Sequence, residues 1–217
     1  MFIGKPIGTL YDYKTAGIYQ LADEKLAGFQ AGTYRIEDLN KDGKITAANH
    51  RKILANTEPA YLYGIQTPEA YKQFTLRAFI NSVQGGKSSY LAANAPAGNY
   101  GTPGNATNSN WFDFTDFWSP RNPNGIHPNP WVPTPAGGRE FFQRNFVRLQ
   151  DISLSYNLTD KTAKKIGASN AKLFVSGKNL LTLTKWKGWD PEVGLGVSSV
   201  NAFPVMKSYS FGVEITF

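Results

Sequence analysis

The sequence predicts an all-β protein whose longest strands form an antiparallel meander. Apolar and polar residues alternate in four segments, at residues 60–82, 146–158, 171–184 and 205–217. Successive side chains of a strand point to opposite faces, so each segment has one apolar and one polar face. The connections between these strands alternate between short and long, which is typical of a meander whose short turns all lie on one side.

The composition agrees with this fold class and excludes several others. Charged residues make up 18% of the 217 residues, and mean hydropathy is −0.36. The sequence has no run of ~18 apolar residues, which excludes helical membrane spans. The low mean hydropathy does not exclude a β-barrel wall, because half of the residues in each of its strands are polar. Cysteine is absent, so disulfides and thiolate metal sites are excluded. The net charge of +7 comes from dispersed lysines and arginines without a nucleic-acid-binding module, so we expect no nucleic-acid partner.

The last predicted strand, at residues 205–217, carries the main evidence for a membrane-spanning sheet. Its odd positions include Tyr209, Phe211, Val213 and Ile215, and its even positions are small or polar apart from Met206. Its length of about 13 residues exceeds the ~5–6 of globular strands, and a transmembrane strand needs ~9–11. The pattern predicts a membrane-spanning strand. The alternative is the half-buried edge strand of a soluble β-sandwich.

The segment at residues 1–59 is predicted to be loop-rich, with short strands such as residues 9–13 and one sharp motif. Residues 38–49 read DLNKDGKITAAN, the front of an EF-hand-type calcium loop, in which Gly43 makes the sharp turn. A cation would take oxygens of Asp38, Asn40, Asp42, the Lys44 carbonyl and Asn49. Because Asn49 stands where a bidentate Glu is expected, calcium binding would be weak. The alternative is an Asx-rich turn that stabilises itself.

The strands at residues 60–217 are joined by connections of unequal length. Residues 60–82 predict a hairpin with its turn at residues 67–70, and residues 159–169 predict a second short connection. Residues 84–140 and 185–204 are long connections, abnormal inside a compact soluble domain but normal for extracellular barrel loops. They carry five tryptophans that would form either a sugar-stacking surface or a small loop core: Trp111, Trp118, Trp131, Trp186 and Trp189.

Short motifs follow one another along nearly the whole chain. They are GKPIG (4–8), GIYQ (17–20), DLNKDGKIT (38–46), YG (63–64), YKQF (71–74), FVRLQDISLSY (146–156), SGKNLLTLT (176–184), GWDPE (188–192) and the terminal Phe217. Each motif is short, but their order and spacing together are specific. In this order they resemble the C-terminal part of SusC/RagA-type TonB-dependent receptors.

The resemblance implies the C-terminal strands of a large, plugged transmembrane β-barrel with long extracellular loops. Such receptors lie in the outer membrane of Gram-negative bacteria and import bulky nutrients, commonly oligosaccharides or peptides. It implies as partners the rest of the barrel and plug, TonB, a SusD-type lipoprotein lid and outer-membrane lipid. It also implies that the barrel-assembly machinery recognises a terminal aromatic residue, and Phe217 matches it.

The length of the chain limits this expectation. A 22-stranded wall needs ~220 residues before any loop or plug, and this chain offers about five strands. No signal peptide opens the sequence, so we expect either a protein that is not exported or a C-terminal piece of a longer one. The alternative function is a secreted β-rich ligand-binding module with a calcium-binding turn. No catalytic motif surrounds His50 or His127, so we expect no enzyme.

Overall fold

The computed structural model describes residues 2–88, 116–132, 134–136, 140–187, 190–192 and 205–217. The chain divides into two compact units. Unit 1 comprises Met1–Glu58, Gly86–Gln143 and Lys187–Ala202, and unit 2 comprises Pro59–Gly85, Arg144–Trp186 and Phe203–Phe217. Trp111 and Trp189 lie outside the described residues.

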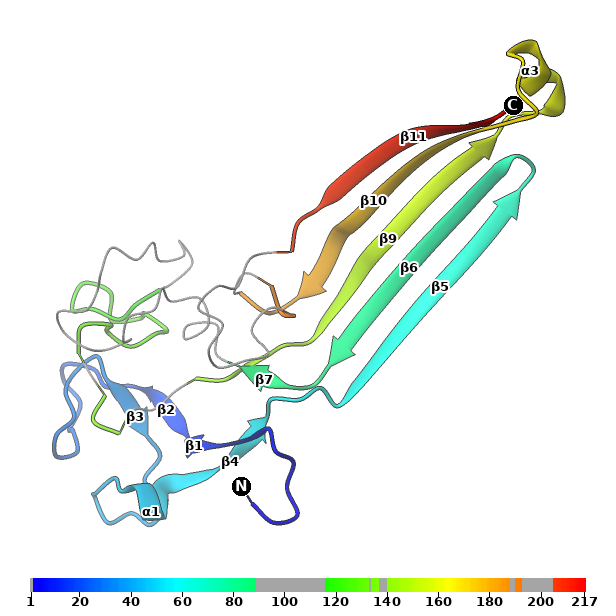
Figure 1. The fold of residues 1–217 in the computed structure, drawn as a ribbon. Coiled ribbons are helices and arrows are strands. Elements are labelled where there is room, and N and C mark those ends of the chain that lie inside the picture. The colour runs from blue at the N-terminus through cyan, green and yellow to red at the C-terminus, as the bar shows by residue number, and fades with distance from the viewer. Residues whose placement is uncertain (1, 89–115, 133, 137–139, 188–189, 193–204) are drawn as a thin grey trace. The chain divides into compact units, whose positions relative to one another are not determined.

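Unit 2 is a five-stranded antiparallel sheet in the order β11-β10-β9-β6-β5 (Figure 1). Each strand pairs with the next one along the chain within this sheet, so the predicted meander is confirmed. The strands have 9 to 15 residues, longer than the ~5–6 of globular proteins. They are β5 (Tyr61–Tyr71), β6 (Phe74–Gln84), β9 (Phe146–Asn157), β10 (Asn170–Thr184) and β11 (Ser208–Thr216).

The predicted hairpin turn at residues 67–70 is wrong. These residues lie inside β5, and the turn is Lys72 and Gln73, with Lys72 at φ 52°. Pro68, which suggested the turn, faces Arg77 across the pair. Counted back from a two-residue turn, this is a non-hydrogen-bonded pair, so the missing N–H of Pro68 costs no bond to β6. The position without an N–H points to the edge of the described sheet, where no described strand pairs with β5.

An irregularity in β9 keeps its apolar residues on one face. Asp151 pairs with Phe79, but the next β6 residue, Ile80, pairs with Leu149, so Gln150 is an extra residue on β9. An extra residue in one strand reverses the alternation beyond it. Leu149 therefore shares the face of Ile152, although strict alternation would place them on opposite faces.

The connection between β9 and β10 contains a short helix, α3 (Asp160–Lys165), where the sequence predicted a polar turn. Ala163 and Ala168 are buried and fix this connection, while its lysines are exposed. The Ser169 N–H donates to the Thr216 carbonyl at 2.7 Å, which ties the connection to the end of β11.

Unit 1 is built from short strand pairs around an aromatic core. The pairs are β1 (Thr9–Tyr13) with β4 (Arg51–Asn56), β2 (Thr15–Ile18) with β3 (Tyr34–Ile36), and β7 (Lys87–Ser88) with β8 (Phe142–Gln143). The one short helix described in this unit is α1 (Ala47–His50). The core comprises Tyr13, Tyr19, Phe29, Tyr34 and Ile36.

The described part of residues 116–143 also packs within unit 1. Trp118 is 3% exposed, and its Nε1 donates to Gln20 Oε1 at 2.7 Å. His127 is buried between the rings of Phe117 and Phe142, with Nδ1 3.4 Å from Glu140 Oε2. Across the described ranges, the model contains no helix of the length and apolarity that a membrane span requires.

Candidate functional site

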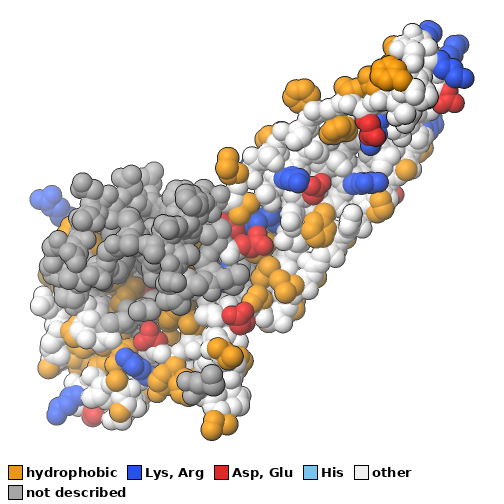
Figure 2. All heavy atoms as spheres, viewed as in Figure 1, with side chains coloured by type: hydrophobic (Ala, Val, Ile, Leu, Met, Phe, Trp, Pro, Cys, Tyr) orange, Lys and Arg blue, Asp and Glu red, His pale blue; other side chains and the backbone are white. Residues whose placement is uncertain are grey.

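One face of the unit 2 sheet is apolar and exposed. Phe211 is 91% exposed and Val213 is 61% exposed, although both are large apolar side chains. Directly opposed residues share a face, and Val213, Leu173, Tyr156 and Phe74 form one such row across four strands. Figure 2 shows apolar side chains projecting along the sheet. We call this surface the apolar face; its exposed members are Tyr61, Tyr63, Ile65, Tyr71, Phe74, Leu76, Leu154, Leu173, Val175, Leu181, Leu183, Tyr209, Phe211, Val213 and Ile215.

The opposite face carries polar groups. It forms an open groove of about 570 Å³ lined by Thr75, Arg77, Asp151, Ser153, Ser155, Asn157, Lys172, Phe174, Ser176 and Glu214. Lys172 and Glu214 oppose each other in register and form an ion pair at 3.0 Å. The aromatic ring of Phe174 lies over Gly212, where an added Cβ would stand 2.5 Å from it. The two faces therefore suit two different solvents, as the terminal strand predicted.

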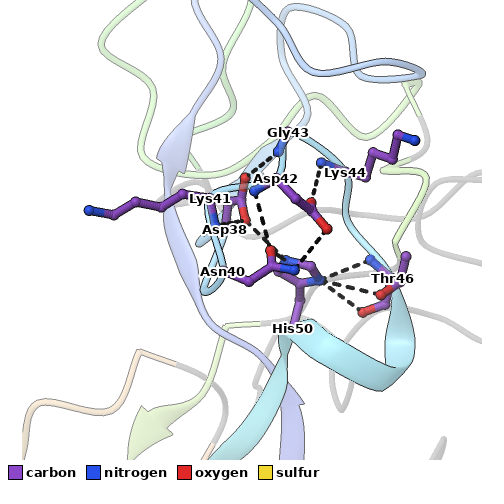
Figure 3. Close-up of polar contacts among 8 residues, drawn as sticks. All are labelled: Asp38, Asn40, Lys41, Asp42, Gly43, Lys44, Thr46 and His50. Atoms are coloured by element: carbon purple, nitrogen blue, oxygen red, sulfur yellow. Dashed lines mark hydrogen bonds and ion pairs between the residues drawn. The ribbon is translucent and has the colours of Figure 1, made fainter.

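The candidate cation loop in unit 1, residues 38–50, is closed by its own hydrogen bonds (Figure 3). The Asp38 carboxylate accepts from the N–H groups of Lys41 at 2.8 Å and Gly43 at 2.9 Å. Asp42 Oδ1 accepts from the Lys44 N–H at 2.8 Å. The Asx-rich turn weighed as the alternative to calcium is thus present.

His50 is the functional-site residue that sequence reasoning missed. It is 1% exposed and points into the loop from the end of α1 (Figure 3). Its Nδ1 accepts from the Thr46 N–H at 3.1 Å, which leaves the hydrogen on Nε2. Nε2 lies 3.1 Å from Asp38 Oδ1 and 2.9 Å from Asn40 Oδ1, so it donates to both. Asn49, the predicted closing residue, is exposed on α1.

The charge of Asp38 is stabilised within this loop. Desolvation acts to raise its pKa, but the hydrogen bonds from the Gly43 N–H, from His50 and from the Lys41 N–H outweigh it, so the pKa lies below its ordinary value. Asp38 is therefore a carboxylate at neutral pH and is available either to His50 or to a cation.

The donor atoms in the loop fit a cation only in part. Ligand atoms of Asp38, Asp42 and His50 lie within 4.8 Å of one another. Calcium takes six to eight oxygens, and Asp38, Asn40, Asp42 and the Lys44 carbonyl offer some of these. The imidazole nitrogen is not a ligand that calcium prefers, and it already engages two of the oxygens. Calcium would have to displace His50.

The other predicted site residues are separate. Trp118 and Trp186 are buried, at 3% and 6% exposed, and Trp131 alone of the three described tryptophans is exposed, at 58%. Trp118 and Trp131 belong to unit 1, and Trp186 belongs to unit 2. A substrate-stacking role for these tryptophans stays a prediction. Phe217 is 86% exposed, directly after β11, and its role in barrel assembly also stays a prediction.

Comparison with known proteins gives two curated relatives that match nearly the whole chain. TonB-dependent receptor P3 of Formosa agariphila is 30% identical, over 99% of this chain and 22% of the relative. The chain aligns with one segment of this receptor. TonB-dependent receptor P26 of the same organism is 22% identical, over 100% of this chain and 23% of the relative. The chain thus spans about a fifth of the length of the curated relatives it matches. No family model matches it.

Solved structures show the same fold. A chain of the RagAB peptide importer in its open-open state superposes with a TM-score of 0.66 at 20% identity, over 100% of this chain and 24% of that chain. The closed-closed state gives a TM-score of 0.66 at 21% identity, over 96% of this chain and 23% of that chain. The all-β antiparallel fold class is therefore confirmed. The curated relatives are named as receptors rather than enzymes, and the alternative of a secreted binding module gains no support.

Proposed function

We propose that this chain supplies five wall strands, with adjoining loops, to a TonB-dependent transporter that imports bulky nutrients across the outer membrane of a Gram-negative bacterium. The observation that carries the proposal is the apolar face of unit 2. Soluble proteins rarely expose contiguous apolar surface on this scale. Lipid accepts it, provided that the polar face points to a lumen.

The open edges of the sheet support the need for further strands. β5 and β11 each have one unpaired side in the described sheet. Unpaired backbone groups are not tolerated in lipid, so a closed barrel must supply strands on both sides. In this proposal the remaining barrel and plug, together with the TonB-contacting segment, belong to parts of the receptor that this chain does not contain.

The proposal includes a substrate class and partners. The structural neighbours are described as a peptide importer, which supports peptides as one class of cargo, with oligosaccharides as the other. A SusD-type lipoprotein lid would cover the extracellular loops, and the barrel-assembly machinery would recognise Phe217. No catalytic role is assigned to the chain.

The test compares the two faces of one strand in the full-length receptor. Val213→Lys places a charge on the apolar face, and the matched control Ser210→Lys places it on the polar face of β11. A lysine on the lipid face costs about 2–4 kcal/mol at the bilayer midplane and less towards the interfaces, whereas a lumen position tolerates it. We expect V213K to deplete folded receptor from the outer-membrane fraction and S210K to retain it. Equal tolerance of both variants would overturn the proposal.

We also propose that the loop at residues 38–49 binds calcium weakly. Asp38, Asn40, Asp42 and the Lys44 carbonyl would hold the ion, and His50 would give up its hydrogen bonds to make room. Ligand oxygens of Asp38 and Asp42 lie within 4.8 Å of each other, which supports this role. Such a site would fix an extracellular segment of the receptor rather than take part in chemistry.

A further inference from the structure

The short connections of the unit 2 sheet lie together at one of its ends. At this end the Asn157 N–H donates to the Gln73 carbonyl at 2.8 Å, which joins the β5–β6 turn to the end of β9. Ser169 donates to the Thr216 carbonyl through its N–H and through its hydroxyl, at 2.7 and 3.0 Å. The β5–β6 turn, the α3 connection and the end of β11 therefore form one surface, which we call the turn end (Figure 1).

The turn end carries an excess of positive charge. Lys72 lies in the hairpin turn, and Lys161, Lys164 and Lys165 lie on α3; all four are exposed. Asp160 is the one acidic residue in the connection at residues 158–169. Of the acids near these strand ends, Glu214 is paired with Lys172, whereas Glu69 is exposed on β5 and offsets one of the four lysine charges. Figure 2 shows the lysines at this tip of the sheet.

The lysines continue the apolar face rather than interrupt it. The Lys72 ammonium lies 5.2 Å from the centre of the Tyr71 ring, and Tyr71 is exposed. Ile166, directly after α3, is 54% exposed, and Phe217 is exposed at the same end. Lysine can lay its stem along apolar surface and hold its charge at the level of the lipid headgroups. Tyrosine is likewise suited to that interface.

We propose that the turn end binds the headgroups of anionic phospholipids through Lys72, Lys161, Lys164 and Lys165. Their acyl chains would lie on the adjoining apolar face. This inference rests on the proposed function, because only a sheet that spans the membrane places its turn end at a lipid surface. Two observations choose this occupant: the charge is complementary to phosphate, and the basic surface is continuous with apolar surface.

The experiment uses the full-length receptor, purified from the outer-membrane fraction in detergent. Native mass spectrometry measures retention of phosphatidylglycerol and of phosphatidylcholine by the wild type and by K161Q/K164Q/K165Q. We expect the triple variant to lose phosphatidylglycerol affinity by about tenfold or more, because each lysine near an anionic surface contributes. Retention of phosphatidylcholine should not change. The matched control, K5Q/K14Q/K187Q, removes three exposed lysines of unit 1 and should behave as the wild type.

Further variants and a competition measurement distinguish the remaining explanations. K161R/K164R/K165R keeps the charge and should retain phosphatidylglycerol, and K72Q alone should show a smaller loss if the triple variant fails to assemble. Inorganic phosphate at millimolar concentration should not compete, and full competition would mean a free-anion site and overturn the proposal. Unchanged phosphatidylglycerol affinity in assembled K161Q/K164Q/K165Q would overturn it while the proposed function stands. A wild-type receptor absent from the outer-membrane fraction would overturn both.

Discussion

The two units of this chain place similar apolar residues in different environments, since unit 1 buries them and unit 2 exposes them. Unit 1 buries its aromatic side chains, with Tyr13, Tyr34 and Trp118 each at most 4% exposed. Unit 2 exposes large apolar residues along whole strands, and Phe146 and Trp186 are its only large apolar residues among the buried described ones. Unit 1 is therefore stabilised by an apolar core, as water-soluble domains are. The strands of unit 2 are held by backbone pairing, and in the proposed transporter lipid would cover their apolar face.

The comparison can be tested most strongly by truncating one phenylalanine in each unit. Phe29 is 8% exposed in the core of unit 1, and Phe211 is 91% exposed on β11. We expect Phe29→Ala to destabilise unit 1 by about 3–5 kcal/mol, the cost of a large core truncation. Phe211→Ala should leave the resistance of unit 1 to proteolysis unchanged. Limited proteolysis of the assembled receptor measures this resistance, and equal sensitivity of both variants would remove the contrast.

The close packing of Phe174 on Gly212 tests how rigid the polar face of unit 2 is. Gly212→Ala forces a Cβ to within 2.5 Å of the Phe174 ring, and overpacking of this kind costs about 1–3 kcal/mol. We expect a lower unfolding temperature of the receptor in detergent. The double variant G212A/F174A should lose less than the sum of the single variants, because the truncated ring makes room. Strictly additive losses of stability would mean that Gly212 is required by the backbone conformation and not by its contact with Phe174.

The cation loop offers a test specific to unit 1. Calcium titration followed by calorimetry should detect weak binding that tightens in His50→Ala, because the imidazole no longer competes for Asp38 and Asn40. Asp42→Asn should weaken binding, because it removes one negative ligand. Absence of calcium heat in both the wild type and His50→Ala would mean that the loop is only an Asx-rich turn.

The smallest expected effect is a pH dependence in unit 1. The pKa of Asp23 is lowered by the hydrogen bond from the Gln20 N–H and by Arg35, against desolvation. A lowered folded-state pKa contributes stability that is present above the unfolded value and is lost as pH falls through the folded one. The loss should therefore occur below the ordinary value of 3.8. Asp23→Asn should reduce the loss of unit 1 stability at acid pH, measured by unfolding at a series of pH values.

Regular alternation made unit 2 predictable from the sequence. The period of two residues gave the strands, their faces and the meander, because each residue on one face had a partner of the same kind across the sheet. The turn was misplaced because Pro68 is a common turn residue, and only the sheet order shows that β5 is an edge. The extra residue Gln150 in β9 shows in the sequence only as a change of phase, from apolar odd positions up to Leu149 to apolar even positions from Ile152.

The site residues of unit 1 were less predictable, for a physical reason. The motif at residues 38–49 specified the loop backbone, including the turn at Gly43. His50 lies one position beyond the motif, and its direction depends on α1 turning it back towards Asp38. Burial of Trp118 depends on Gln20 and Gly32, which are about 90 residues away in the sequence. Contacts over such separations carry no periodic signal that a single sequence displays.

The irregular register of β9 and β10 has a mechanical consequence. Both strands break register at nearly the same level, at Gln150 in β9 and between Lys178 and Leu181 in β10. β10 has 15 residues, whereas crossing a bilayer takes ~9–11. The paired irregularities thus bend both strands at the same level and increase their twist. In the proposed transporter, the ends of β9 and β10 beyond these irregularities would extend past the lipid towards the long connections.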